Sequence, residues 1–261
     1  MESLIQTLAV GQVYAFMMVF VRVGTAMMIM PGIGDGFVPG RVRLLFALGF
    51  SAILTPVLAA TLPPGTGAGM GFLSLLVGEF VMGAFIGGIA RAMMAALDTA
   101  GMFISMHMGL ANAQIFNPAM ATQGSIMGAF MSVTGALLLF ATNMHHLVLQ
   151  ALMDSYRTFP PGDIGMSLSG AMADSYATAV TQSFAVGFHI SMPFILVTMM
   201  VYVAMGILSR VMPQLQVFVL FMPVQIMAGL LIFTLVVSAG MMYWLSSYQE
   251  AVSMFLVPRG G

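Results

Sequence analysis

The sequence predicts an all-α integral membrane protein built from about six long hydrophobic helices. Of the 261 residues, 60% are hydrophobic and 6% are charged, whereas roughly a quarter of an ordinary soluble chain is charged. Residues 99–153 contain no Asp, Glu, Lys or Arg. Helices are expected because lipid offers no water to satisfy the backbone of open strands. Most of the chain therefore faces lipid or the apolar surfaces of other subunits.

Composition excludes several classes of function. The chain has no cysteine, and so no disulfide, thiolate metal site or cysteine nucleophile. It has no lysine for a Gly-x-x-x-x-Gly-Lys phosphate loop. Its net charge of −1 gives nucleic-acid binding no electrostatic basis. The first residues are Met1-Glu2-Ser3, which lack the basic character of a signal peptide, so the first hydrophobic segment is expected to be retained. We expect no cofactor.

Six stretches have roughly the ~20 apolar residues that a helix needs to cross the hydrocarbon core. They cover residues 8–30, 44–60, 72–90, 126–153, 177–208 and 215–245. Segments rich in Pro and Gly separate several of them and favour turns. The last two stretches are longer than one span requires. We expect them to tilt, to kink at Pro193 and Pro223, or to leave the bilayer within a larger assembly.

Residues 92–123 do not fit this simple pattern. Residues 92–110 are predicted to be helical, but a polar segment that contains Pro118 follows them. Non-helical backbone at membrane depth is tolerated only against protein or a water-filled cavity. The segment is therefore either a re-entrant loop that lines a path or an ordinary surface loop.

The arginines suggest an orientation. Arg41, Arg43, Arg91 and Arg210 fall in the first, third and fifth connections, whereas Arg157 alone falls in the fourth. Because positive charge favours the cytoplasmic side, both termini are predicted to lie outside the cytoplasm.

The few charges within or beside the predicted spans are expected to be structural. A lone charge at the bilayer centre costs ~3 kcal/mol or more, so each should face protein and find a partner. We interpret the following residues as structural charges: Arg22, Glu79, Arg91, Asp98 and Arg210. A transport site among such residues is the less favoured interpretation.

Other chemistry has weaker support in the sequence. Gly32-Ile33-Gly34-Asp35 matches a Gly-x-Gly-Asp pattern of intramembrane aspartyl proteases. Two carboxylates must share a site for that reaction, and such a hydrolase would use Asp35 together with Asp98. His145 and His146 are adjacent and would point about 100° apart on a helix, so they are unsuited to gripping one metal ion. We predict no catalytic and no metal site.

Methionine is unusually frequent, at 30 residues. Its flexible, polarizable side chain can fill irregular gaps and repack against different partners. This favours a compliant seal or an adaptable apolar surface. Simple replacement of leucine in membrane helices stays open as the alternative.

Ten short stretches, in this order along the chain, resemble the FliR/SctT family of type III export-gate proteins. They are residues 20–24 (FVRVG), 38–43 (VPGRVR), 78–83 (GEFVMG), 98–101 (DTAG), 108–113 (MGLANA), 116–118 (FNP), 145–147 (HHL), 155–156 (SY), 192–194 (MPF) and 206–214 (GILSRVMPQ). Their order and coverage, rather than any single piece, carry the resemblance.

The resemblance implies a helical export gate shared with FliP-like and FliQ-like subunits, and contacts with FlhB-like and FlhA-like subunits. It implies one membrane domain, residues 1–255, with a FliP-like part over about 1–175 and a FliQ-like helical hairpin over about 176–250. Residues 256–261 are interpreted as an appended thrombin site, since Leu256 to Gly260 matches its recognition sequence. The implied location is the bacterial inner membrane at the flagellar basal body.

In this family a loop corresponding to about residues 110–123 plugs the closed pore. The resemblance assigns that role to the following residues: Leu110, Asn112, Gln114, Ile115, Phe116, Asn117, Pro118 and Met120. Two positions depart from the family pattern. Asn117 stands where relatives often have Asp, and His107 stands where many have Gln. A charge-dependent role at position 117 is therefore not expected.

The predicted function is that of a non-enzymatic core subunit of the flagellar type III export gate, which passes unfolded flagellar subunits. The alternative is a small-solute or proton-coupled transporter that uses Glu79, His145 and His189. An intramembrane hydrolase and a purely structural subunit without pore contact are further rivals.

Overall fold

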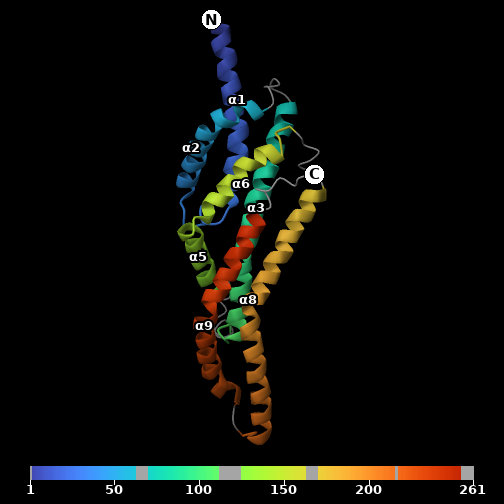
Figure 1. Ribbon diagram of the computed structural model, residues 1–261. Helices are drawn as coiled ribbons and strands as arrows, with labels where there is room; N and C mark the ends of the chain where they lie inside the picture. The colour runs from blue at the N-terminus through green and yellow to red at the C-terminus, as the bar shows by residue number, and fades with distance from the viewer. Residues whose placement is uncertain (1, 63–69, 112–124, 163–169, 215–216, 254–261) are drawn as a thin grey trace. The chain divides into compact units, whose positions relative to one another are not determined.

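A computed structural model describes residues 2–62, 70–111, 125–162, 170–214 and 217–253, and only these residues are discussed structurally. Every regular element in these ranges is helical (Figure 1), as the sequence predicts. The elements are α1 (Glu2–Ile29), α2 (Gly40–Leu58), the 3-10 turn η1 (Ala59–Thr61), α3 (Met70–His107), α5 (Ile126–Ala141), α6 (Met144–Thr158), α8 (Gly170–Val211) and α9 (Val217–Ser253). Residues 256–261, interpreted from the sequence as a thrombin site, lie outside the described residues.

Five of these helices are long and apolar enough to cross a membrane: α1, α2, α3, α8 and α9. The bent pair of α5 and α6 makes a sixth if it counts as one span. Three helices exceed one span considerably, because α3 has 38 residues, α8 has 42 and α9 has 37. At 1.5 Å per residue, 38 residues correspond to about 57 Å of helix, against about 30 Å of hydrocarbon.

The chain forms two compact units that are not consecutive in sequence. Unit 1 contains Met1–Ala92, Leu139–Val180 and Gln249–Gly261, and unit 2 contains Met93–Leu138 and Thr181–Tyr248. The helices α3, α5, α8 and α9 each contribute residues to both units. This spatial division does not test the FliP-like and FliQ-like parts, which stay a prediction.

Two predicted boundaries differ from the structure. Arg91 was expected between two helical stretches, but α3 continues through it, since Ala90, Arg91 and Ala92 all have high helix propensity. Conversely, the stretch 126–153 is two helices, with a 73° bend between α5 and α6. Asn143 at the bend adopts a left-handed conformation with φ of 59°. Asparagine is one of the few residues with a side chain that tolerates this conformation.

In unit 1, α1 and α3 pack closely at two glycines of α3. A Cβ atom on Gly87 would lie 2.8 Å from the carbonyl oxygen of Ala26, and one on Gly83 would collide with the carbonyl oxygen of Arg22. The pair matches the small-x-x-x-small pattern that allows helices to approach in lipid. The two glycines therefore let α1 and α3 approach closely.

In unit 2, α3 packs against α5 and α9. A Cβ atom on Gly101 of α3 would lie under 3.0 Å from the backbone of Gly128 in α5. Trp244 of α9 is fully buried and donates its indole N–H to the carbonyl oxygen of Met93 at 2.8 Å. The indole N–H is thus hydrogen-bonded although it is buried in an apolar core.

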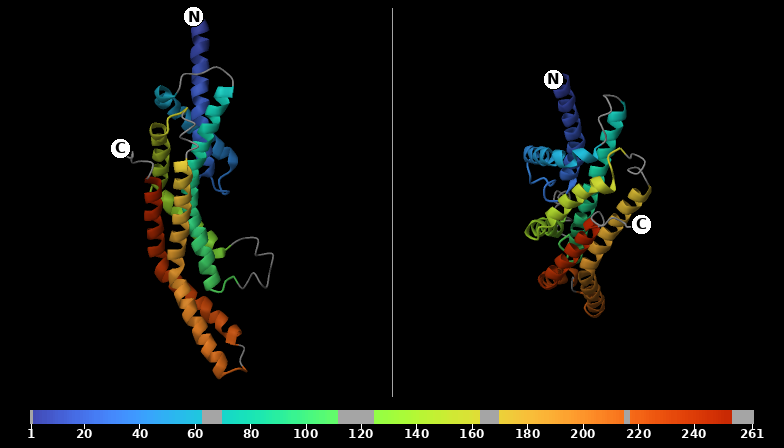
Figure 2. Two further views of the ribbon diagram at one scale, coloured as in Figure 1. Left: turned by 90° about the vertical axis from the view of Figure 1, so that its right-hand side faces the viewer. Right: turned by 45° about the horizontal axis from the view of Figure 1, so that its top comes forward.

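The second half of unit 2 is a helical hairpin of α8 and α9, which run side by side in both views of Figure 2. The rings of Phe194 and Phe233 lie 6.4 Å apart between the two helices, and Ile190 contacts the position of Gly240. Pro193 and Pro223 lie inside α8 and α9, which both continue past them.

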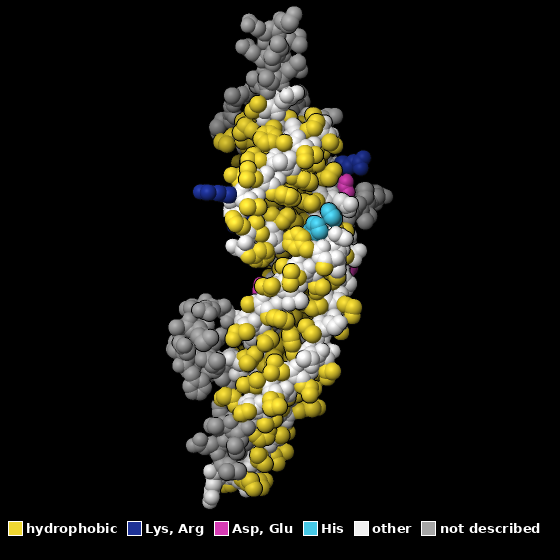
Figure 3. All heavy atoms as spheres, turned by 90° about the vertical axis from the view of Figure 1, so that its left-hand side faces the viewer, with side chains coloured by type: hydrophobic (Ala, Val, Ile, Leu, Met, Phe, Trp, Pro, Cys, Tyr) yellow, Lys and Arg dark blue, Asp and Glu magenta, His cyan; other side chains and the backbone are white. Residues whose placement is uncertain are grey.

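Large hydrophobic side chains remain exposed in both units, and hydrophobic side chains dominate the face drawn in Figure 3. On the hairpin they include Met199, Met200, Val203, Met227 and Leu235. Contiguous apolar surface of this kind marks contact with lipid or with other proteins.

The close contact at Gly101 predicts a clear effect of a single methyl group. Gly101→Ala should lower the midpoint of thermal unfolding in detergent, because overpacking costs ~1–3 kcal/mol. The matched control is Gly206→Ala in α8, where a Cβ atom meets nothing within 4 Å. The control should be neutral or slightly stabilising, since alanine favours helix. Equal midpoints for the two variants would contradict the close packing of α3 and α5.

Candidate functional site

A buried ion pair joins α1 and α3 in unit 1. Arg22 of α1 and Glu79 of α3 have side chains that are 1% and 2% exposed. The guanidinium donates from Nε to Glu79 Oε2 at 2.6 Å and from Nη2 to Glu79 Oε1 at 3.0 Å. Such a two-point contact combines charge attraction with fixed geometry.

Two further N–H groups of the Arg22 guanidinium bond to the end of α6. Nη1 donates to the Ser155 hydroxyl at 3.2 Å, and Nη2 donates to the carbonyl oxygen of Phe159 at 3.1 Å. The Tyr156 ring lies 4.0 Å from the guanidinium carbon, in cation–π geometry. The cluster therefore neutralises both charges internally, as the sequence predicts for structural charges, and it ties α1, α3 and α6 together.

The other predicted charges lie in different settings. Arg91 forms an ion pair with Asp35, and the Asp35 carboxylate also accepts the backbone N–H of Gly32 at 2.8 Å. Asp98 accepts a hydrogen bond from the Ser132 hydroxyl of α5. Arg210 is exposed in the last turn of α8. Asp35 and Asp98 thus have separate partners, which gives no support to a paired-carboxylate protease.

The side chains of His145 and His189 each lie beside an aromatic ring. His145 stacks near Phe140 and His146, with ring centroids 5.0 and 4.1 Å away. His189 is 3.2 Å from the Tyr243 hydroxyl through Nδ1. Within the described ranges there is no cluster of three or more His, Cys, Asp or Glu side chains suited to a metal ion.

The predicted plug loop leaves α3 through a well-defined turn. Gly109 is left-handed, with φ of 77°. Its N–H donates to the carbonyl oxygen of Met106 at 3.2 Å, and the N–H of Leu110 donates to the carbonyl oxygen of Ser105 at 3.0 Å. These two bonds form a Schellman motif, which ends a helix and satisfies carbonyl groups of its last turn. Glycine is favoured at position 109 because it has no Cβ to oppose positive φ.

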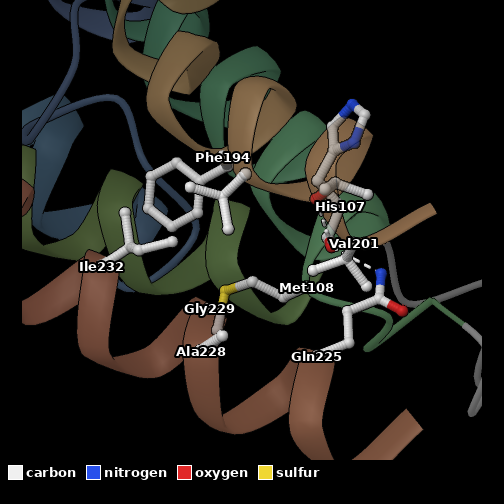
Figure 4. Close-up of a pocket in the computed structure, with 10 residues that line it drawn as sticks. His107, Met108, Phe194, Val201, Gln225, Ala228, Gly229 and Ile232 are labelled. Atoms are coloured by element: carbon white, nitrogen blue, oxygen red, sulfur yellow. Dashed lines mark hydrogen bonds between the residues drawn. The ribbon is translucent and has the colours of Figure 1, made fainter. Parts of the chain in front are cut away.

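One further carbonyl at this helix end is satisfied from the hairpin. The carbonyl oxygen of His107 accepts a hydrogen bond from the Thr198 hydroxyl of α8 at 3.0 Å. It accepts a second from the Gln225 side-chain amide of α9 at 2.7 Å. Figure 4 shows Gln225 directed toward this carbonyl, beside Met108 and Gly229. We call Thr198 and Gln225 the hairpin clamp.

The other end of the predicted loop is attached through Ser125. Its hydroxyl donates to the carbonyl oxygen of Gly101 at 2.9 Å and lies 2.7 Å from the Ser105 hydroxyl. It also accepts the N–H of Gly128 at 3.0 Å, which caps the N-terminus of α5. Ser125 thus fastens the start of α5 to α3.

Of the residues assigned to the plug, only Leu110 is described. The others lie outside the described residues: Asn112, Gln114, Ile115, Phe116, Asn117, Pro118 and Met120. Sequence reasoning missed the residues that hold the loop ends, namely Thr198, Gln225 and Ser125. A signal was available, because a lone polar side chain within an apolar helix must find a partner.

Comparison with known proteins places these features in a family. Residues 13–251 match the family of bacterial export proteins, family 1. Flagellar biosynthetic protein FliR of Caulobacter vibrioides is 36% identical over 245 residues, which cover 94% of this chain and 96% of that protein. FliR of Bacillus subtilis is 29% identical over 81% of this chain and 82% of its own length. Yop proteins translocation protein T of Yersinia pestis is 28% identical over 59% of each chain.

The long apolar helices and internally neutralised charges define an all-α membrane protein. This chain belongs to the family of bacterial export proteins, family 1, because the match spans nearly its whole length and a curated relative exceeds 30% identity. The resemblance found in the sequence motifs is confirmed.

The buried ion pair predicts that substitution of one partner destabilises the protein more than substitution of both. Glu79→Leu alone should greatly reduce the yield and the thermal midpoint, because an unpaired buried charge costs ~3–5 kcal/mol. The double variant Arg22→Leu, Glu79→Leu should recover much of the loss, since no charge is then left unpaired. Arg157→Leu, at an exposed position of α6, is the control and should change little. Strictly additive losses in the double variant would contradict a coupled pair.

Proposed function

We propose that this chain is a non-enzymatic core subunit of a flagellar type III protein export gate. The observation that carries the proposal is the family match over residues 13–251, with FliR relatives aligned over most of the chain. The gate would lie in the bacterial inner membrane at the flagellar basal body. Its cargo would be unfolded flagellar subunits.

The lengths of the helices support an assembly rather than a solitary membrane protein. α3, α8 and α9 each extend well beyond the hydrocarbon thickness, and they carry exposed apolar side chains on unit 2. Apolar surface outside the bilayer is stable only when it is covered, and tilt alone accommodates a limited excess. FliP-like and FliQ-like subunits are the covering partners that the family resemblance implies, with FlhB-like and FlhA-like subunits as further neighbours.

The state of the charges favours a gate over a solute transporter. Glu79 has both carboxylate oxygens bonded to Arg22, and the pair is buried in unit 1. A proton or ion relay would need an intramembrane group free to change its charge or ligand. The described residues instead support the role of Glu79 in holding the fold together.

The proposed mechanism is steric and apolar gating by residues 110–123. The two ends of this segment are held at α3 and α5, by the Schellman turn at Gly109 and by Ser125. Ile115, Phe116 and Met120 would obstruct the closed pore and move aside for substrate. An apolar constriction blocks ions by dewetting, and flexible methionine side chains adapt to a passing chain.

Removal of the plug residues should open the gate to ions. Deletion of residues 112–120 should raise the ion conductance of vesicles that carry the assembled gate, while the amount of assembled complex stays unchanged. The deletion spares both attachment points, because His107 and Ser125 remain. A deletion of residues 64–68, in a different connection, is the control. Unchanged conductance in an intact complex would refute the plug.

Assembly provides a separate test. The chain produced alone should aggregate or give mixed species in detergent, because its apolar surface lacks its partners. Co-produced with FliP-like and FliQ-like subunits, it should elute as one discrete particle of defined mass. A stable monomer with no partner, together with normal export when the gene is removed, would overturn the proposed function.

A further inference from the structure

The end of α3 is held by two different mechanisms. An α-helix leaves its last four carbonyl groups without partners inside the helix. Here the Schellman turn satisfies two of them, since the N–H groups of Gly109 and Leu110 donate to the carbonyl groups of Met106 and Ser105 respectively. A third, on His107, is bonded by Thr198 and Gln225. The hairpin thus satisfies a carbonyl group that the local turn does not.

Packing beside these bonds fixes the same point. Met108 is 1% exposed, and its side chain lies against Gly229 of α9, where a Cβ atom would approach the Met108 Cβ to 3.0 Å. The neighbouring cavity, lined by residues such as Phe194, Thr198 and Ile232, holds about 10 Å³. A space of that size admits about one water molecule. The end of α3 therefore has little freedom to shift relative to the hairpin (Figure 4).

We propose that Thr198 and Gln225 are positioning residues that make the turn at Gly109, through which the chain leaves α3, follow the α8–α9 hairpin. The hairpin holds the last carbonyl of α3, from which the chain continues through Gly109 toward residues 112–124. A displacement of the hairpin is passed to this carbonyl and then to the direction in which the chain leaves α3. A partner that binds the exposed face of the hairpin would thereby bias this direction.

This inference rests on the proposed gating role of the loop, but its first readout does not. The chain has no cysteine, so two introduced cysteines can be labelled specifically. Ala111→Cys and Val133→Cys place spin labels just after the turn at Gly109 and on the exposed face of α5, a helix of unit 2. The distribution of distances between the labels, measured in the assembled complex, reports the direction in which the chain leaves α3.

The variants remove the hydrogen bonds with little change in side-chain shape. Thr198→Val and Gln225→Leu should each broaden the distance distribution. The population of molecules in which the end of α3 is detached from the hairpin should rise by about fivefold, the ratio expected for the net loss of one hydrogen bond. The double variant should exceed the product of the single effects, because the carbonyl of His107 then loses both partners. Conductance of the assembled gate should rise in parallel.

Two exposed residues of α9 provide matched controls. Thr234→Val removes a hydroxyl that bonds only within α9, to the carbonyl oxygen of Leu231 among the described contacts, and Gln249→Leu removes an exposed amide. Neither should change the label distances. If the double variant fails to assemble, the single variants still give the result.

The outcomes separate the inference from the proposed function. Unchanged label distances in Thr198→Val and Gln225→Leu would overturn the inference, even if deletion of residues 112–120 makes the gate leak. Broadened distances with unchanged conductance, together with no leak in the deletion, would support the positioning role and refute the plug. A thermal midpoint that falls without any change in label distances would show a merely structural cap and would also overturn the inference.

Discussion

The structure depends on one constraint, which is that a charged or hydrogen-bonding group buried in an apolar protein is costly unless a partner inside the chain satisfies it. Arg22 meets this demand with Glu79, Ser155, the Phe159 carbonyl and the Tyr156 ring. Because desolvating two charges costs several kcal/mol per ion, such a pair is stable only when its hydrogen bonds are made. The cluster consequently determines how α1, α3 and α6 meet in unit 1.

Among its described residues, unit 2 meets the same constraint with neutral groups. Its helices are joined by hydroxyl, amide and indole groups that bond backbone carbonyls, as at Trp244 with Met93, Ser125 with Gly101, and the hairpin clamp with His107. Such bonds are individually modest. They are directional, however, and several of them lie at the ends of α3 and α5, where the predicted loop begins and ends.

The two units are thus held together by different interactions, a buried ion pair in unit 1 and neutral hydrogen bonds in unit 2. This difference fits the proposed export-gate subunit. Unit 1 is tied by a buried ion pair, in which replacement of one partner leaves the other charge unpaired. The loop ends of unit 2 are held by neutral bonds that a movement of a helix can make or break. The apolar surfaces that remain exposed on α8 and α9 suit contact with other helical subunits. An adaptable, methionine-rich surface repacks more easily than one built from branched side chains.

The sequence by itself determined the helical class, the main hydrophobic segments, the family and the pairing of buried charges in principle, because hydrophobicity and charge act locally and leave a pattern along the chain. It did not reveal that Arg91 lies inside one continuous helix, that Asn143 breaks another, or that Arg22 selects Glu79 as its partner. The hairpin clamp was also not predicted from the sequence. Thr198 and Gln225 are 91 and 118 residues from His107. They bond a backbone carbonyl group, which every residue type has and which therefore leaves no signal in the sequence. Only the tertiary structure decides which polar group meets which, because each partner must be supplied by a distant segment of the chain.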